Sequence, residues 1–256
     1  MDFNKNKVLW LKDKYNNATA YYPLKIPSVS AVLDQIPDPS LEQFIKDVGE
    51  EKAKQIMEDA QHRGTAMHCF IEHFVKHYNK TNDVTSSLQY TLEFSQKQLL
   101  EVDKVPLEKI DKGKDLFFNF YYSNYVTLYK DLIGSELSLY SPTYYFRGKA
   151  DVFYKQLGIG RVVTDFKTSS KQIENGSIKE LKYKRQLGAY ALALEDMFKK
   201  QNVIINKASL LIMITKSSLI QEIVVQGQDL EEQKQEFKTL VKQFHINNDQ
   251  SFLING

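Results

Sequence analysis

The sequence is poor in cysteine and contains no long apolar run. Its 256 residues include a single cysteine, Cys69, which excludes a disulfide framework and any zinc or iron–sulfur site ligated by a cluster of this chain's cysteines. No stretch of about 18 apolar residues is present, so we expect no membrane-spanning helix. No Walker-type phosphate loop occurs either, so the signature of a nucleotide-driven motor is missing.

The amino-terminal stretch also lacks targeting features. Residues 1–17, MDFNKNKVLWLKDKYNN, contain no apolar core of the kind found in signal peptides, and they combine acidic residues with no arginine, unlike a mitochondrial presequence. We therefore expect a cytoplasmic protein. The formal net charge is only +2, so any basic surface for nucleic acid must be local. The lack of an evident dimerisation stripe predicts a monomer.

Hydrophobic periodicity predicts a first half made of helices. A short helix should begin at Pro27, with Ser28 as its N-cap. A long helix is expected over about 50–78, and an interruption at Gly64 is left open. The other expected helices span about 41–47, 88–102, 106–125, 177–200 and 229–246, and residues 79–87 should form a loop.

The second half of the chain alternates strands with helices. The strands are expected at 133–140, 143–155, 161–167, 207–215 and 219–226. Three strands, a helix and two further strands predict an α/β (α+β) fold with a mixed central sheet, a crossover helix and flanking helices. We expect one domain over residues 1–256, with an N-terminal helical lobe at about 41–130 and a sheet-bearing core at about 131–246.

Two acidic residues and a lysine stand on neighbouring expected strands. Asp151 ends the segment Gly148-Lys149-Ala150-Asp151, and Asp165-Phe166-Lys167 begins fourteen residues after it. Asp165 and Lys167 should point to the same face because strand side chains alternate. Asp151 and Asp165 could bracket a Mg²⁺ or Mn²⁺ ion, which prefers carboxylate oxygens. Lys167 could then position or deprotonate a water, or stabilise charge on a phosphate. The alternative is a surface salt-bridge ladder.

A histidine on the long helix is the next candidate ligand. His68 lies at the edge of an apolar stripe, from which a helix-borne imidazole could reach a metal held by the sheet. Glu72 follows one turn later and could support such a site. The stripe consists of Met67, Phe70, Ile71, Phe74, Val75 and Tyr78. The competing interpretation is a boundary histidine that packs on the core.

Polar residues near the lysine complete the candidate set. Gln186 and Tyr190 are four residues apart and should share a helix face, where they could touch a phosphate or form a polar boundary. Thr168 and Ser169 could hydrogen-bond a phosphate or cap the next turn. Arg185 belongs to a locally basic stretch that could follow a nucleic-acid backbone.

One more acidic residue precedes the hairpin. Glu136 stands on the strand before the segment that ends at Asp151. From a neighbouring strand it could reach the same site. It could equally be an edge charge without a functional role.

The order of these motifs resembles the PD-(D/E)XK nuclease superfamily in its RecB-like branch. The pattern is His68 on a helix, G-x-A-D ending at Asp151, D-x-K at 165–167 and Q-x-x-x-Y at 186–190. The sequences of residues 27–33, 164–169 and 186–190 are similar to those of the group that contains the mitochondrial genome maintenance exonuclease and its phage and bacterial relatives. The resemblance covers roughly residues 25–246, and the ordered set is more specific than D-x-K alone.

The resemblance implies a restriction-endonuclease-like fold and a metal-dependent exonuclease that prefers single-stranded DNA. It implies that His68, Asp151, Asp165 and the backbone carbonyl of Phe166 bind Mg²⁺ or Mn²⁺. Lys167 would be the catalytic lysine, acting with the two aspartates. Gln186, Tyr190, Thr168 and Ser169 would contact the substrate, and the helical lobe would form an arch over single-stranded DNA.

The chain departs from the family in two respects, and alternative functions stay open. The missing presequence favours a phage or bacterial setting, and the missing cysteines predict that no iron–sulfur cluster is bound. A double-strand-dependent exonuclease and a flap or structure-specific endonuclease keep the same chemistry with another substrate. A DNA-binding module without catalysis is the non-enzymatic alternative, although such a module has no need of Asp151, Asp165 and Lys167 together.

Overall fold

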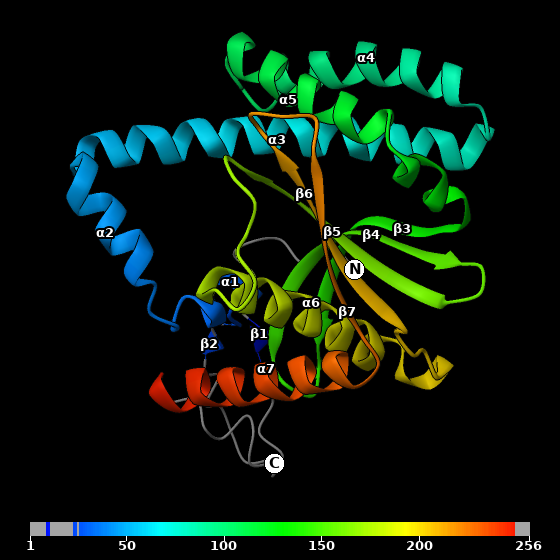
Figure 1. Cartoon of the computed structure of the whole chain (residues 1–256). Helices are drawn as coiled ribbons and strands as arrows, with labels where there is room; N and C mark the ends of the chain where they lie inside the picture. Colours follow the sequence, from blue (N-terminus) through cyan, green and yellow to red (C-terminus); the bar gives the residue numbers. More distant parts are fainter. Residues whose placement is uncertain (1–8, 11–22, 25, 249–256) are drawn as a thin grey trace.

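A five-stranded mixed sheet forms the centre of the molecule, as expected for an α/β fold (Figure 1). The computed structural model describes residues 9–10, 23–24 and 26–248. The sheet order is β3 (Leu132–Ser141), β4 (Phe146–Gln156), β5 (Gly160–Ser169), β6 (Lys207–Ile214) and β7 (Ile220–Gln226). A separate two-stranded antiparallel pair joins β1 (Leu9–Trp10) to β2 (Pro23–Leu24).

Both antiparallel and parallel pairing occur in the central sheet. Strands β3, β4 and β5 form an antiparallel meander, and β6 and β7 form a second antiparallel pair. Strands β5 and β6 run parallel and are joined through α6 (Ile178–Met197). A parallel pair needs such a crossover because a tight hairpin can only reverse the chain. The mixed sheet and the crossover helix predicted from the sequence are thus confirmed.

Several helices precede the sheet and form the N-terminal helical region. They are α1 (Val29–Leu33), α2 (Pro39–Val48), α3 (Glu50–Thr81), α4 (Val84–Glu101) and α5 (Leu107–Tyr121), followed by the 3₁₀ segment η1 (Asn124–Asp131). The short η2 (Lys199–Gln201) and the helix α7 (Gly227–Asn247) lie later in the chain. The hydroxyl of Ser28 accepts a hydrogen bond from the N–H of Ala31 at 3.1 Å, so the predicted N-cap is confirmed.

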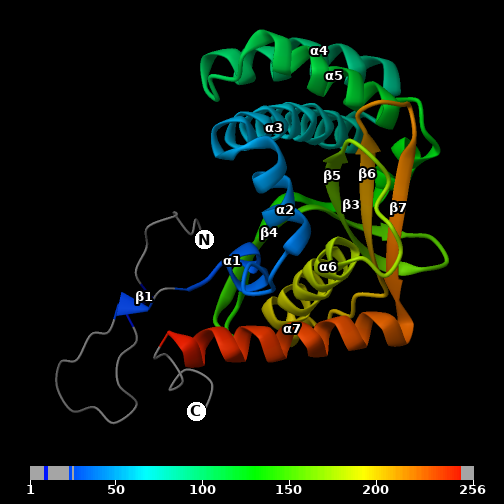
Figure 2. The ribbon, with the colours of Figure 1, turned by 60° about the vertical axis from the view of Figure 1, so that its left-hand side comes forward.

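Two apolar cores hold the layers together. On one side α4 and α5 cover α3, whose stripe residues Phe70 and Phe74 pack with Phe117 and with Phe166 of β5 in one buried cluster (Figure 2). On the other side α6 and α7 cover the sheet. Helix α3 therefore lies between the sheet and the pair α4 and α5, which brings its polar edge close to the strands. No helix in the described part of the chain is long and apolar enough to cross a membrane.

The structure decides one open point about the expected helices and corrects one of their boundaries. Helix α3 continues through Gly64 without a break, because one glycine costs only about 1 kcal/mol in a helix that is held by packing on both sides of it. The expected loop at 79–87 is too long, since only Asn82 and Asp83 separate α3 from α4. The carboxylate of Asp83 caps α4 by accepting the N–H groups of Thr85 and Ser86 at 2.9 and 3.2 Å.

Candidate active site

The imidazole of His68 reaches the sheet from α3. Its Nδ1 atom lies 3.3 Å from Oδ2 of Asp151 on β4, and its ring meets that of Phe166 edge-on at a centroid distance of 6.2 Å. This orientation follows from the buried stripe of α3, which packs into the lobe core and leaves the adjacent edge of the helix facing the strands. The predicted approach of a helix-borne histidine to the acidic residues is present in the structure.

The two aspartates stand opposite one another on β4 and β5. The antiparallel register runs to the pair Val152↔Thr164, so Asp151 and Asp165 occupy the next step. There the carboxylate Oδ2 of Asp151 accepts a hydrogen bond from the backbone N–H of Phe166 at 2.7 Å. Asp151 is therefore fixed by both the helix and the neighbouring strand, which orients it without help from a flexible loop.

The second half of the site is built by β5 and α6. The ammonium Nζ of Lys167 lies 2.5 Å from Oδ2 of Asp165, as expected for residues on one face of a strand. The side-chain amide of Gln186 donates to the same Asp165 oxygen at 3.4 Å and to the hydroxyl of Tyr190 at 2.7 Å. A residue spacing of four on α6 thus places the amide and the phenol together beside the aspartate–lysine pair.

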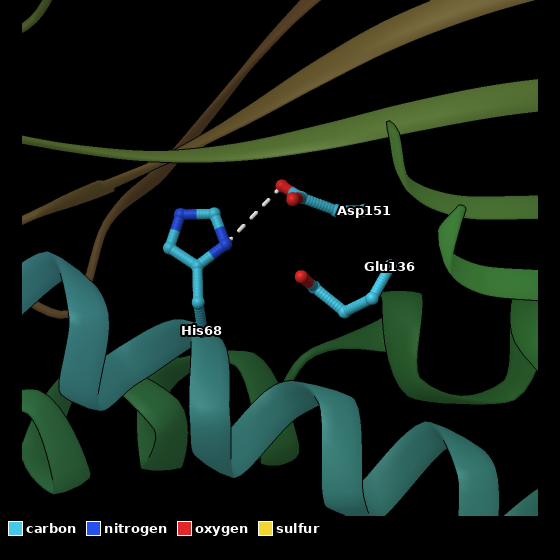
Figure 3. Close-up of side chains that lie close together, drawn as sticks. All are labelled: His68, Glu136 and Asp151. Carbon is cyan, nitrogen blue, oxygen red and sulfur yellow. Dashed lines mark ion pairs between the residues drawn. The ribbon is translucent and has the colours of Figure 1, made fainter. Parts of the chain in front are cut away.

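Glu136 lies next to His68 and Asp151, a position that the sequence left open. Donor atoms of His68, Glu136 and Asp151 all lie within 4.8 Å of one another, and Figure 3 shows the three side chains converging from α3, β3 and β4. Glu136 has a backbone φ of 51°, which is uncommon for a residue with a side chain. Its carboxylate also forms an ion pair with Lys149 of β4. Glu136 is therefore a member of the cluster and not an isolated edge charge.

Burial and neighbouring charges shift the titration of the cluster. Burial alone would lower the pKa of His68, but the carboxylate of Asp151 outweighs it, so the pKa of His68 is raised. Burial alone would raise the pKa of Asp151, but the nearby His68 outweighs it and the net pKa is lowered. The pKa of Asp165 is raised to about 6, chiefly by burial and also by the charge of Asp151.

The lysine responds to the same surroundings. Burial opposes its charge, but the carboxylate of Asp165 more than compensates and raises the pKa of Lys167. Lys167 therefore stays protonated at neutral pH. Burial is also the main reason why the pKa of Tyr190 is raised, so its phenol remains a neutral hydrogen-bonding group.

The donor set fits a hard divalent cation. Two carboxylates and one imidazole within 4.8 Å offer oxygen and nitrogen ligands, and no cysteine contributes among the described residues. Carboxylate oxygens with a single histidine suit a hard ion such as Mg²⁺ or Mn²⁺ better than they suit a soft metal ion. Asp165 lies beside this group across the β4–β5 pair, so it can add a third carboxylate.

Some predicted residues lie apart from the cluster. The carboxylate of Glu72 pairs with Lys76 on α3, and the guanidinium of Arg185 lies 3.2 Å from Glu236 of α7. Ser169 is buried, and its hydroxyl accepts a hydrogen bond from the N–H of Lys171 at 3.5 Å.

The alternation of β5 separates the remaining polar pair. Ser169 shares a face with Asp165 and Lys167, whereas Thr168 shares the opposite face with Phe166. Thr168 is half-buried. The two hydroxyls thus stand on different faces of the sheet, and their contact with a substrate stays a prediction.

Two residues near the site had no role in the sequence reasoning. Lys149 stood inside the G-x-A-D motif, and the structure pairs it with Glu136. Tyr183 precedes Gln186 by one helical turn and lies near Lys167 and Asp165, where burial raises the pKa of its phenol. The spacing of three residues from Gln186 was the available signal for Tyr183. Nothing in the sequence indicated the Glu136–Lys149 contact.

The chain is thus an α/β protein whose mixed sheet presents a histidine, acidic residues and a lysine at the junction with a helix, a group that could hold a metal ion. The family model of the PD-(D/E)XK nuclease superfamily matches residues 44–253, and the chain belongs to this superfamily. Nucleases of this superfamily generally use divalent metal ions and act on DNA. No curated protein matches the sequence.

Two solved structures are similar to this chain. One is a protein of Eubacterium rectale that carries the name "Putative exonuclease", with 14% identity and a TM-score of 0.41 over 69% of this chain and 67% of that chain. The other is SSO0001, with 16% identity and a TM-score of 0.28 over 68% of this chain and 72% of that chain.

Proposed function

We propose that this protein is a divalent-metal-dependent DNA exonuclease that prefers single-stranded DNA and serves DNA replication, recombination or repair. The observation that carries the proposal is the convergence of His68, Asp151, Asp165 and Lys167 from one helix and two strands. A salt-bridge ladder accounts for an aspartate beside a lysine, but it gives no reason to aim an imidazole at the second aspartate. Membership of the nuclease superfamily supports the same chemistry.

His68, Asp151, Asp165 and the backbone carbonyl of Phe166 would hold the cation. When bound, a Mg²⁺ or Mn²⁺ ion would neutralise phosphate charge and lower the pKa of a water molecule. The chain's own part is to keep these ligands in place. The N–H of Phe166 fixes Asp151, and the amide of Gln186 fixes Asp165. Such supporting hydrogen bonds restrict the ligand orientations and so favour one geometry.

Lys167 would stabilise negative charge on the scissile phosphate. Its raised pKa keeps the ammonium protonated, so it suits charge stabilisation and positioning of a water better than removal of a proton. About a third of the Lys167 side chain is exposed although its partner Asp165 is buried, so the lysine lies nearer the surface than the aspartate. A phosphate could reach it there without displacing the aspartate.

Gln186 and Tyr190 would orient the substrate from α6. Both are linked to Asp165 through the amide of Gln186, and both stay uncharged at neutral pH. Ser169, on the same face of β5 as Lys167, would contact the strand beyond the lysine, and Thr168 would do so only at the exposed end of β5. Because phosphate contacts carry no base information, this set predicts weak dependence on DNA sequence.

The single-strand preference rests on the helices around the site. Helix α2 links α1, which packs near α6 on one face of the sheet, to the start of α3 on the other face (Figures 1 and 2). Asp38 at the start of α2 also interacts electrostatically with Lys179 and Lys182 of α6. If DNA passes along α2 between these two layers, a flexible single strand would fit there more readily than a stiff duplex.

Cleavage of end-labelled single-stranded DNA tests the proposal. With Mg²⁺ or Mn²⁺ we expect progressive shortening that EDTA abolishes and that Lys167→Ala lacks, and the position of the label gives the polarity. A covalently closed single-stranded circle should resist an exonuclease. Cleavage of the circle or of a flap would instead indicate an endonuclease, and cleavage restricted to duplex ends would indicate a double-strand-dependent exonuclease. Metal-indifferent binding without cleavage of any substrate would favour a binding module.

A further inference from the structure

Gly64 is the one glycine inside a described helix that packing does not explain. Glycine weakens a helix interior, so its use there needs a reason. An added Cβ atom would lie 2.4 Å from Ala66 at Gly113 and 2.6 Å from the backbone of Gln233 at Gly188, so those two glycines allow helices to approach each other. A Cβ atom at Gly64 would meet nothing within 4 Å. The space in front of Gly64 is therefore not filled by any residue that the structure describes.

The position of Gly64 relates it to the candidate site. Gly64 precedes His68 by four residues, so it lies on the same face of α3, about 6 Å along the helix axis. Its neighbour Thr65 is exposed and precedes His68 by three residues. The hydroxyl of Thr65 makes no hydrogen bond to any other part of the described chain. The backbone of Gly64, which no side chain covers, and the hydroxyl of Thr65 thus lie next to each other, one helical turn from the proposed metal ligand His68.

We propose that Gly64 and Thr65 form a contact point for the sugar–phosphate backbone of the DNA strand next to the scissile bond. The absence of a side chain at Gly64 lets the strand lie against α3. The hydroxyl of Thr65 donates a hydrogen bond to a phosphate oxygen, a type of contact that positions nucleic acid without reading its bases. The pair acts by positioning the strand along α3 next to His68, and it takes no part in the chemical step.

This inference rests on the proposed function and predicts a combination of effects that a structural role would not give. Filling Gly64 should stabilise the helix, because Ala and Leu are better helix formers than Gly. The same substitutions should weaken the binding of single-stranded DNA, and Leu should weaken it more than Ala. If Gly64 were required only for folding, replacing it with a larger residue would instead lower the stability of the protein.

The experiment compares Gly64→Ala, Gly64→Leu, Thr65→Val and Thr65→Ser with the wild type. Binding of a fluorescent single-stranded oligonucleotide is measured with Mn²⁺ in a Lys167→Ala background, which prevents cleavage, and kcat and KM are measured in the active background. Thermal unfolding in EDTA reports the helix effect. Asn79→Ala, an exposed change on α3 away from Gly64, controls for helix stabilisation alone.

We expect both Gly64 variants to raise Tm by about 2–4 °C. Gly64→Leu and Thr65→Val should each raise Kd about tenfold and KM more than they lower kcat, whereas Thr65→Ser restores binding. Asn79→Ala should leave Kd unchanged. Gly64→Leu and Thr65→Val proteins that bind and cleave like the wild type would overturn the inference while leaving the proposed function intact. A wild type that neither binds nor cleaves DNA would overturn both.

Discussion

Glu136 and Asp151 face each other across strands β3 and β4. The register pairs Ser135 with Val152 and Leu137 with Ala150, which places Glu136 opposite Asp151 between them. At this step the backbone of Glu136 turns into the left-handed region with a φ of 51°. A non-glycine residue keeps such a conformation only where its surroundings impose it, and such residues gather at functional sites. We therefore expect Glu136 to contribute to metal binding.

Two substitutions of Glu136 distinguish the effect of its charge from the effect of its backbone conformation. Glu136→Gln should weaken Mn²⁺ binding about tenfold, because it removes one carboxylate from a cluster of two carboxylates and one imidazole. Glu136→Gly should weaken binding equally and also raise the free energy of unfolding by about 1 kcal/mol, because glycine adopts a positive φ without a steric penalty. Titration calorimetry and urea unfolding in EDTA measure the two effects. Unchanged Mn²⁺ affinity in both variants would make Glu136 a structural residue.

The pH dependence of metal binding should follow Asp165. Because the pKa of Asp165 is raised to about 6, its carboxylate is increasingly protonated as the pH falls through 6 and is then a poor ligand. Mn²⁺ affinity should therefore decline between pH 7 and pH 5. Calorimetry at several pH values measures it, and Asp165→Asn should show lower affinity with less pH dependence. An affinity that is constant over this range would contradict the raised pKa.

The stability of the metal-free protein should change in the opposite direction. A raised pKa in the fold means that Asp165 favours folding when protonated, so this contribution is present below the ordinary pKa of 3.8 and is lost as the pH rises through about 6. His68, whose pKa is also raised, acts in the same direction at higher pH. The free energy of unfolding in EDTA should thus fall from pH 5 to pH 7. A rise over this interval would show that other groups dominate.

The sequence predicts the parts of this protein that depend on periodicity and on spacing along one element. The buried stripe of α3, the Asp165–Lys167 pair and the Gln186–Tyr190 pair follow from a period of 3.6 or 2, and the structure contains each of them. The site roles given to these residues stay predictions, as does the assignment of the whole chain to one domain.

Other features depend on contacts between elements and have no local signal. The left-handed backbone of Glu136 and its pairing with Lys149 arise from the β3–β4 register, which the composition of either strand does not fix. The close packing of Gly188 against Gln233 is a similar case. A glycine in a helix does not by itself indicate its partner, and only the position of α7 shows that Gly188 admits that helix.

Gly188 should tolerate no side chain. A Cβ atom there would lie 2.6–2.8 Å from the backbone and side chain of Gln233, so α6 and α7 would have to separate. Gly188→Ala should therefore lower the free energy of unfolding by about 1–3 kcal/mol despite the better helix propensity of alanine. Urea unfolding measures the change. Stabilisation by this variant would mean that the helices can shift at little cost.

Lys167 and a divalent cation should compete for Asp165. The ammonium lies 2.5 Å from the carboxylate and stays protonated because of it, so it neutralises an oxygen that a metal ion would also use. Lys167→Met keeps most of the apolar stem and removes the charge. We expect this variant to lose about 10²–10³-fold in cleavage, as for the loss of one group that stabilises transition-state charge. Its Mn²⁺ affinity should rise, because the competing cation is gone.

Comparison with Lys155→Met makes this test specific. Lys155 is exposed on β4, and its replacement removes one positive charge without touching the cluster. Both variants change the net charge equally, so a gain in Mn²⁺ affinity that is confined to Lys167→Met must come from the contact with Asp165. A loss of Mn²⁺ affinity in Lys167→Met would instead mean that the lysine holds Asp165 in its ligating orientation. In that case the loss of cleavage would result from a disordered metal site and not from the missing positive charge beside the phosphate.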